Sequence, residues 1–165
     1  MLDGAILSDH GAPVTIGHDT IVMEGVLLRG TPHHPVVIGD NVILGPRAYP
    51  TGCAIGSRTF IATNASVFTG AVVEEDAELR IGAVVRLRTR IPSGTTVPIG
   101  WIAVGDSAVI LPPDHHDEIW AAMEPLDVPG YVFGVPRGSV DEPMVEITRR
   151  YARSMRRRMD RGEER

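Results

Sequence analysis

The chain has 165 residues, a formal net charge of −5 and an aromatic content of only 5%. This length allows a domain with its own core, and the acidic balance disfavours bulk nucleic-acid binding. So few aromatic rings require a core of small aliphatic side chains, as in repeat architectures. The single cysteine, Cys53, excludes an internal disulfide and a zinc ribbon and favours a cytoplasmic location. Neither a signal peptide nor a membrane span is expected, because no long apolar run occurs.

A six-residue repeat runs through the middle of the chain. From Ile55 to Arg90 every first position is Ile, Val or Leu and every fifth position is Ala or Thr, in the hexapeptides IGSRTF, IATNAS, VFTGAV, VEEDAE, LRIGAV and VRLRTR. The same phase extends upstream to Ile16. We expect each hexapeptide to form a short strand with its first side chain inward, followed by a tight corner.

This pattern predicts an all-β solenoid, a left-handed parallel β-helix of about five coils, within residues 1–111. Three strands close one triangular coil, and successive coils stack at about 4.8 Å. Two irregularities interrupt the period. Residues 30–37 form a proline-rich loop that contains His33 and His34, and residues 50–54 are one residue short.

Residues 112–165 are expected to form C-terminal helices. Short extended pieces at 101–104 and 109–111 precede a helix at 115–123, and the proline and glycine content of 125–142 predicts a connecting loop. A second helix begins at Pro143 and continues to about Asp160. Its apolar residues recur at spacings of three and four, and arginines occupy its opposite face.

Several segments resemble the gamma-class carbonic anhydrases in their order and spacing. They are VVIGDNV at 36–42, GCAIG at 52–56, GAVVEED at 70–76 and GWIAVGDSA at 100–108, and the similarity covers about residues 14–120. The resemblance implies a homotrimer with zinc between its subunits. In that family three histidines hold the metal, two from one chain and one from its neighbour.

The three positions that match these histidines carry other residues here, namely Arg29, Pro46 and Thr51. A guanidinium does not bind zinc at ordinary pH, proline has no side-chain donor atom, and a threonine hydroxyl is a poor zinc ligand. We therefore predict no metal, no other cofactor and no hydration of carbon dioxide. By the same alignment Met23 replaces a glutamine, and His10 replaces an acid.

The phase of the repeat groups outward side chains into columns. One column contains Arg29, Thr51, Phe68 and Arg86, and another contains Glu24, Pro46, Thr63 and Ile81. The two columns lie on different faces, so two subunits of a trimer could bring them together. Arg80, Arg86, Arg88 and Arg90 are interpreted as solubilising or interface charges.

Arg29 places a permanent positive charge at a position of the family's metal site, and an arginine fork binds carboxylates well. We predict that it anchors a small anionic molecule in a subunit-interface pocket with Thr51, Phe68, Met23 and Pro46. The candidate catalytic residues are Arg29, His10 and Glu24. The simpler alternative is an ion pair between Arg29 and Glu24 of a neighbouring subunit.

Three functions follow from these residues. The first is binding, and possible transformation, of a small anionic molecule at this pocket by a metal-independent, lyase-like or transferase activity. The second is a structural or assembly subunit without activity. The third is acyl or CoA transfer, which hexapeptide-repeat enzymes perform with a histidine on the coil. Only His18 lies on a regular coil here, which counts against the third.

Overall fold

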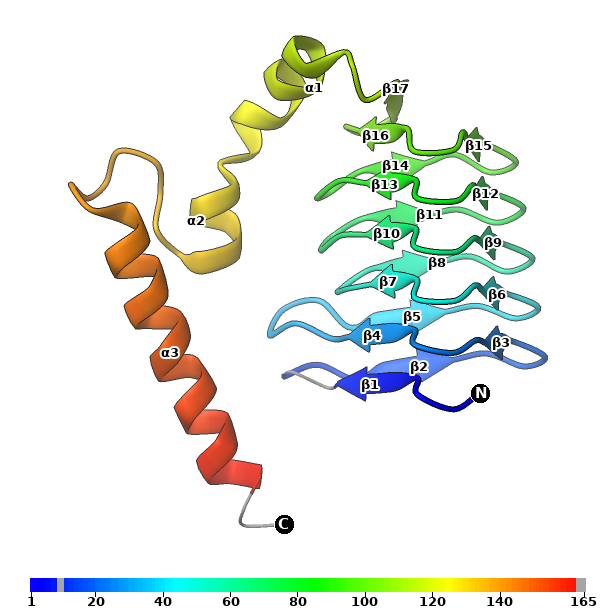
Figure 1. Ribbon diagram of the computed structural model, residues 1–165, viewed down its shortest axis with the longest axis horizontal. Helices are drawn as coiled ribbons and strands as arrows, with labels where there is room; N and C mark the ends of the chain where they lie inside the picture. The colour runs from blue at the N-terminus through cyan, green and yellow to red at the C-terminus, as the bar shows by residue number, and fades with distance from the viewer. Residues whose placement is uncertain (9–10, 163–165) are drawn as a thin grey trace. The chain divides into compact units, whose positions relative to one another are not determined.

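The structure is a computed structural model of the chain, and it describes residues 1–8 and 11–162. The chain forms two compact units, Met1–Ala122 and Met123–Arg165. The first unit is a parallel β-helix of about five coils, as predicted (Figure 1). Its left-handed winding stays a prediction from the hexapeptide period.

The strands of the coil form three faces, which we name A, B and C. Face A contains β1 (Ile6–Ser8), β4 (Leu27–Arg29), β7 (Tyr49–Pro50), β10 (Ser66–Val67), β13 (Val84–Val85), β16 (Ile102–Val104) and the antiparallel β17 (Val109–Leu111). Face B contains β2 (Val14–Ile16), β5 (Val36–Ile38), β8 (Ala54–Ile55), β11 (Val72–Val73) and β14 (Arg90–Ile91). Face C contains β3 (Ile21–Val22), β6 (Ile43–Leu44), β9 (Phe60–Ile61), β12 (Glu78–Leu79) and β15 (Thr96–Val97).

The register of the strands explains the repeat. Ile55, Val73 and Ile91 pair in register at intervals of eighteen residues, which is three hexapeptides. Ile38 pairs with Ile55 after seventeen residues, which confirms the short segment at 50–54. Backbone hydrogen bonds join β4 to the next coil, from Leu27 N to Ala48 O at 3.1 Å, so face A is continuous.

The core is a set of aliphatic ladders that the first positions of the hexapeptides form. Leu44, Ile61, Leu79 and Val97 stack above one another on face C and are fully buried. The fifth positions supply small buried residues such as Ala65 and Ala83. Because successive residues of a strand point to opposite sides, the neighbours of these core residues face outward and are free to carry function.

Corner residues in the left-handed backbone conformation let each strand turn into the next. Asn41, Asn64 and Asp76 have φ angles of 57°, 59° and 59°. Asparagine and aspartate tolerate this conformation better than most residues because their short polar side chains can bond locally. The corners therefore keep the residues that follow each strand at the same place on every coil.

Beyond the coil the chain is helical. The helices are α1 (His116–Met123), η1 (Glu124–Leu126), α2 (Val128–Phe133) and α3 (Pro143–Gly162). The short helix and the long C-terminal helix were predicted, but α2 and the last two residues of η1 lie in the segment 125–142 that was expected to be a loop. Pro129 sits in the first turn of α2, where its missing N–H costs nothing, and Gly134 ends the helix with a φ of 68°.

In the second unit α2 packs against α3. The rings of Phe133 and Tyr151 meet edge to face with centroids 6.0 Å apart, and Ile147 is buried. Arg150 donates to Gly134 O at 2.6 Å, which satisfies a carbonyl at the end of α2. Among the described residues no helix is long and apolar enough to cross a membrane.

Candidate functional site

Four side chains that follow the strands of face A stack into one column, which we call the Arg29 column. A backbone bridge joins Arg29 to Thr51, and the parallel pairing of β7, β10 and β13 continues the stack to Phe68 and Arg86. Ser8 pairs with Arg29 on the N-terminal side. The structure therefore confirms the column that the phase of the repeat predicted.

The arginines at the two ends of this column carry buried donors that lack acceptors. In the described part of the chain neither Arg29 Nε nor Arg86 Nε has a hydrogen-bond partner. Thr51, next to Arg29, is only 5% exposed. A buried donor without a partner destabilises the protein by about 1–3 kcal/mol, and more when the group is charged. The terminal nitrogens of both guanidinium groups are not among these covered atoms, so they are the donors that an anion from solvent could reach.

Phe68 lies between the two arginines on the column. The Arg86 guanidinium carbon is 5.3 Å from the centroid of the Phe68 ring, within the range of a cation–π interaction. Tyr49 meets the same ring edge to face at a centroid distance of 6.2 Å. Burial lowers the pKa of Arg86, but a guanidinium pKa is high enough that the group stays charged at neutral pH.

Arg86 is the residue of this site that the sequence interpretation missed. It was grouped with Arg80 and Arg90 as a solubilising or interface charge. Arg80 pairs with Glu78 at 2.8 Å and Arg90 with Glu74 at 2.9 Å, which fits that interpretation for both. Arg86 differs because it is half-buried against Phe68. Its position on the same column as Arg29 was the signal that could have identified it.

The other candidate residues lie at a different edge of face A. Met23, Glu24 and Pro46 follow strands of face C, at the corner that leads into face A. The Glu24 carbonyl oxygen accepts a hydrogen bond from the Arg47 backbone N–H at 3.0 Å, which joins this corner to the same corner of the next coil. Within the described part of one chain these residues lie apart from Arg29. This separation agrees with the phase of the repeat, which placed the two columns on different faces. His10 lies outside the described residues.

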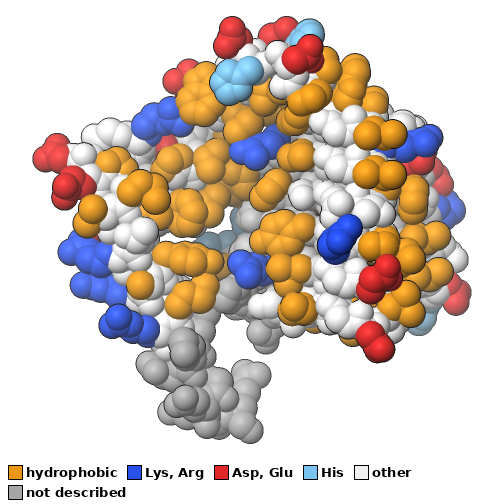
Figure 2. Space-filling view, viewed as in Figure 1, with side chains coloured by type: hydrophobic (Ala, Val, Ile, Leu, Met, Phe, Trp, Pro, Cys, Tyr) orange, Lys and Arg blue, Asp and Glu red, His pale blue; other side chains and the backbone are white. Residues whose placement is uncertain are grey.

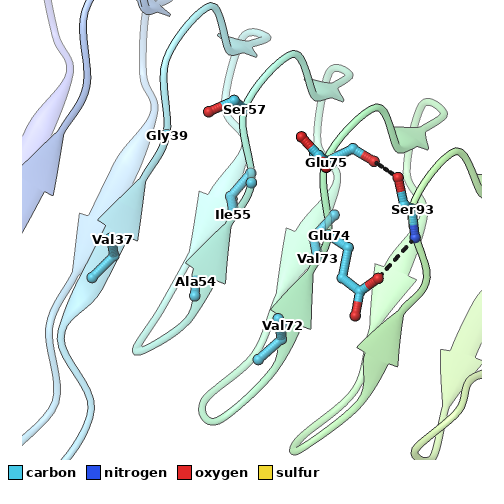
Figure 3. A pocket seen from close by; sticks show the side chains of 11 residues that line it. Val37, Gly39, Ala54, Ile55, Ser57, Val72, Val73, Glu74, Glu75 and Ser93 are labelled. Carbon is cyan, nitrogen blue, oxygen red and sulfur yellow. Dashed lines mark hydrogen bonds between the residues drawn. The ribbon is translucent and has the colours of Figure 1, made fainter.

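Face B carries a shallow groove of about 410 Å³ (Figure 3). Val37, Ala54 and Val72 form its floor, and Glu74 and Ser93 stand at one end. Glu74 accepts hydrogen bonds from Arg90 at 2.9 Å and from the Ser93 N–H at 3.1 Å, and the Arg90 bond lowers the pKa of Glu74. This carboxylate is ionised and already paired, so it is a poor proton acceptor.

Two further side chains that could do chemistry, those of Cys53 and His34, belong to the structural framework. Cys53 is buried, and burial raises the pKa of its thiol to about 12, so the reactive thiolate is scarce at neutral pH. His34 belongs to the loop between β4 and β5, where its backbone pairs with Thr31. Partial burial, with His33 beside it, lowers the pKa of His34 and favours the neutral ring.

No protein-family model matches the chain. Gamma carbonic anhydrase 1 of Arabidopsis thaliana, a mitochondrial protein, is 36% identical over 97 residues, and gamma carbonic anhydrase 2 of the same plant is 31% identical over 97 residues. Over this segment the chain is homologous to the gamma carbonic anhydrases. The match covers 55% of this chain and 35% of each relative, so the chain spans about a third of their length.

Among solved structures, the gamma carbonic anhydrase-like coil is similar to the acetyltransferase domain of PglB from Neisseria gonorrhoeae. The TM-score is 0.51 at 22% identity, over 66% of this chain and 55% of that one. At this identity the likeness concerns the fold alone, because many unrelated activities share one fold.

The three residues that the resemblance aligns with the family's histidines can be judged by their chemistry. Arg29 and Thr51 are neighbours on adjacent coils, whereas Pro46 is at the corner after face C. None of the three offers the imidazole, thiolate or carboxylate that zinc prefers. Among the described residues, no three His, Cys, Asp or Glu side chains are placed to share a metal ion within one chain.

Proposed function

We propose that this gamma carbonic anhydrase-like chain binds a small carboxylate at the Arg29 column. The observation that carries the proposal is the half-buried Arg29 guanidinium beside the nearly buried Thr51, a cation whose Nε has no acceptor among the described residues. A carboxylate accepts two parallel hydrogen bonds from an arginine fork, and partial burial strengthens that charged contact. The neighbouring Thr51 can add a hydroxyl donor, and Phe68 an apolar wall.

The proposal includes the loss of zinc chemistry. Arg29, Pro46 and Thr51 do not form a zinc-binding donor set, so we expect no metal-activated water and no hydration of carbon dioxide. The column supplies two cations, a hydroxyl and a ring, which suit binding and charge stabilisation. A lyase-like reaction also needs a general base. Glu24, at the other edge of face A, can serve only if it comes from a second copy of the chain.

We also propose that three copies associate. On face C, Ile21, Ile43 and Phe60 pair in register and face outward, with exposures of 50%, 39% and 40%. Figure 2 shows many hydrophobic side chains on the visible side of the coil, with basic and acidic side chains among them. Contiguous apolar surface of this kind favours self-association. Light scattering should give three times the chain mass of 17.8 kDa, and a monomer mass would contradict this expectation.

A non-catalytic assembly subunit is the second candidate function. The unpaired Nε of Arg29 favours it equally if Glu24 of a neighbouring copy provides the acceptor. An ion pair of that kind would stabilise the assembly in place of a metal. The two candidates differ in one respect, because only the first requires Arg29 to accept an added carboxylate.

Replacing Arg29 by glutamine tests the first candidate. We expect Arg29→Gln to weaken hexanoate binding by about tenfold or more, because a charged hydrogen bond contributes roughly 1.5–3 kcal/mol. Isothermal titration calorimetry on the purified oligomer measures the change. Glutamine keeps the first methylene groups of the arginine side chain and stays polar, but it carries no charge.

Arg58→Gln is the matched control for charge. Arg58 lies at the corner between faces B and C, pairs with Asp76 at 2.7 Å, and is exposed. Its replacement removes the same charge and should leave hexanoate affinity unchanged. If wild type binds no hexanoate and Glu24→Gln lowers the oligomer's stability as much as Arg29→Gln does, the ion pair of the assembly subunit is the better explanation.

A further inference from the structure

The second arginine of the column has no role in binding a single carboxylate. Arg86 stands three rungs above Arg29, so their backbones are separated by about 14 Å at the usual strand spacing. One carboxylate is too small to reach both guanidinium groups across that distance. Yet Arg86 shares with Arg29 a buried Nε that lacks a partner in the described part of the chain.

Between the two charges the column carries Thr51, which is nearly buried, and the aromatic ring of Phe68. Phe68 occupies the rung below Arg86, and Tyr49, from strand β7 of face A, packs edge to face against its ring. The Arg86 guanidinium already leans over the Phe68 ring at 5.3 Å, which brings its charge toward Arg29. The column therefore presents, in order, a cation, a threonine, an aromatic ring and a second cation.

We infer that the ligand of this site is an extended dicarboxylate, with one carboxylate at Arg29 and the other at Arg86. Its apolar middle packs along Phe68, where contact with the ring replaces water. This inference rests on the proposed function and narrows the ligand class from any small carboxylate to a molecule with two anionic ends. Polar tricarboxylates fit less well, because they would place a charge against the rings.

The experiment compares each diacid with the monoacid of the same carbon number. Adipate is paired with hexanoate, suberate with octanoate and sebacate with decanoate, all titrated into the wild-type oligomer by calorimetry. We expect at least one diacid to bind about tenfold or more tightly than its monoacid, since a second charged contact is added. The diacid whose length matches the spacing of the two arginines should show the largest ratio.

Arg86→Gln separates the two ends of the site. It should reduce the diacid-to-monoacid ratio to about one, because it weakens the diacids far more than the monoacids. Arg86→Met keeps the apolar stem against Phe68 and removes only the charge, so it replaces the glutamine variant if that one unfolds at a lower temperature. Arg58→Gln again controls for net charge, and it should preserve the wild-type ratio.

The outcomes distinguish this inference from the proposed function. If monoacids and diacids bind equally and Arg86→Gln changes neither, the dicarboxylate is excluded while the Arg29 site stands. If neither class binds at millimolar concentration, the proposed function itself fails. If diacids bind but the preference survives Arg86→Gln, the second carboxylate lies elsewhere and the inference is overturned.

Discussion

Replacing Val73 by aspartate is expected to prevent the coil from folding, whereas the same replacement at the adjacent Val72 is expected to be tolerated. Val73 is 1% exposed and stacks between Ile55 and Ile91, so an aspartate there buries a carboxylate without a partner. Such a change destabilises a protein by roughly 4 kcal/mol or more, a large part of a typical total stability. Circular dichroism and size-exclusion chromatography measure the outcome.

Val72 provides the control because it has the same side chain on the same strand but points outward into the face B groove. We expect Val72→Asp to lower the free energy of unfolding by about 1 kcal/mol or less. The milder pair Val73→Ala and Val72→Ala should rank in the same order, with about 2 kcal/mol lost at the core position. Equal thermal midpoints for the two aspartate variants would contradict the assignment of inward and outward positions.

The fold could be predicted because its determinants are local in the sequence. A strand of two residues followed by a corner places every sixth residue inward, so the period alone identifies the core ladder that contains Ile61 and Leu79. The helix α2 was missed for the opposite reason. Pro129 and Gly134 were counted as loop residues, whereas their positions at the start and end of one short helix make both of them compatible with it.

The candidate site could be predicted only in part. The phase of the repeat correctly stacked Arg29, Thr51, Phe68 and Arg86, because residues at equal phase occupy equal places on successive coils. It could not show that Arg86 is half-buried, since this depends on how one side chain lies over a ring on the next rung. It also could not complete the pocket, because Met23, Glu24 and Pro46 lie at another edge and meet Arg29 only if a second copy brings them there.

Purified, tag-free wild-type protein is expected to contain far less than one zinc per subunit and to hydrate carbon dioxide at the background rate. The reason is the chemistry at the matched positions, where Arg29, Pro46 and Thr51 offer no good zinc donor. Without a bound metal, water keeps its ordinary pKa, so no hydroxide nucleophile forms at neutral pH. Elemental mass spectrometry and stopped-flow hydration on the same sample measure both quantities.

The triple variant Arg29→His, Pro46→His and Thr51→His gives the complementary test. If these positions correspond to the family's ligands, three imidazoles should take up zinc wherever a second copy brings the two edges of face A together, with a content that approaches one per subunit. Zinc near one per subunit in the wild type, with fast hydration, would instead mean that the alignment is wrong. His10, His33 or His34 would then have to supply the ligands, and the carboxylate site at Arg29 would lose its main premise.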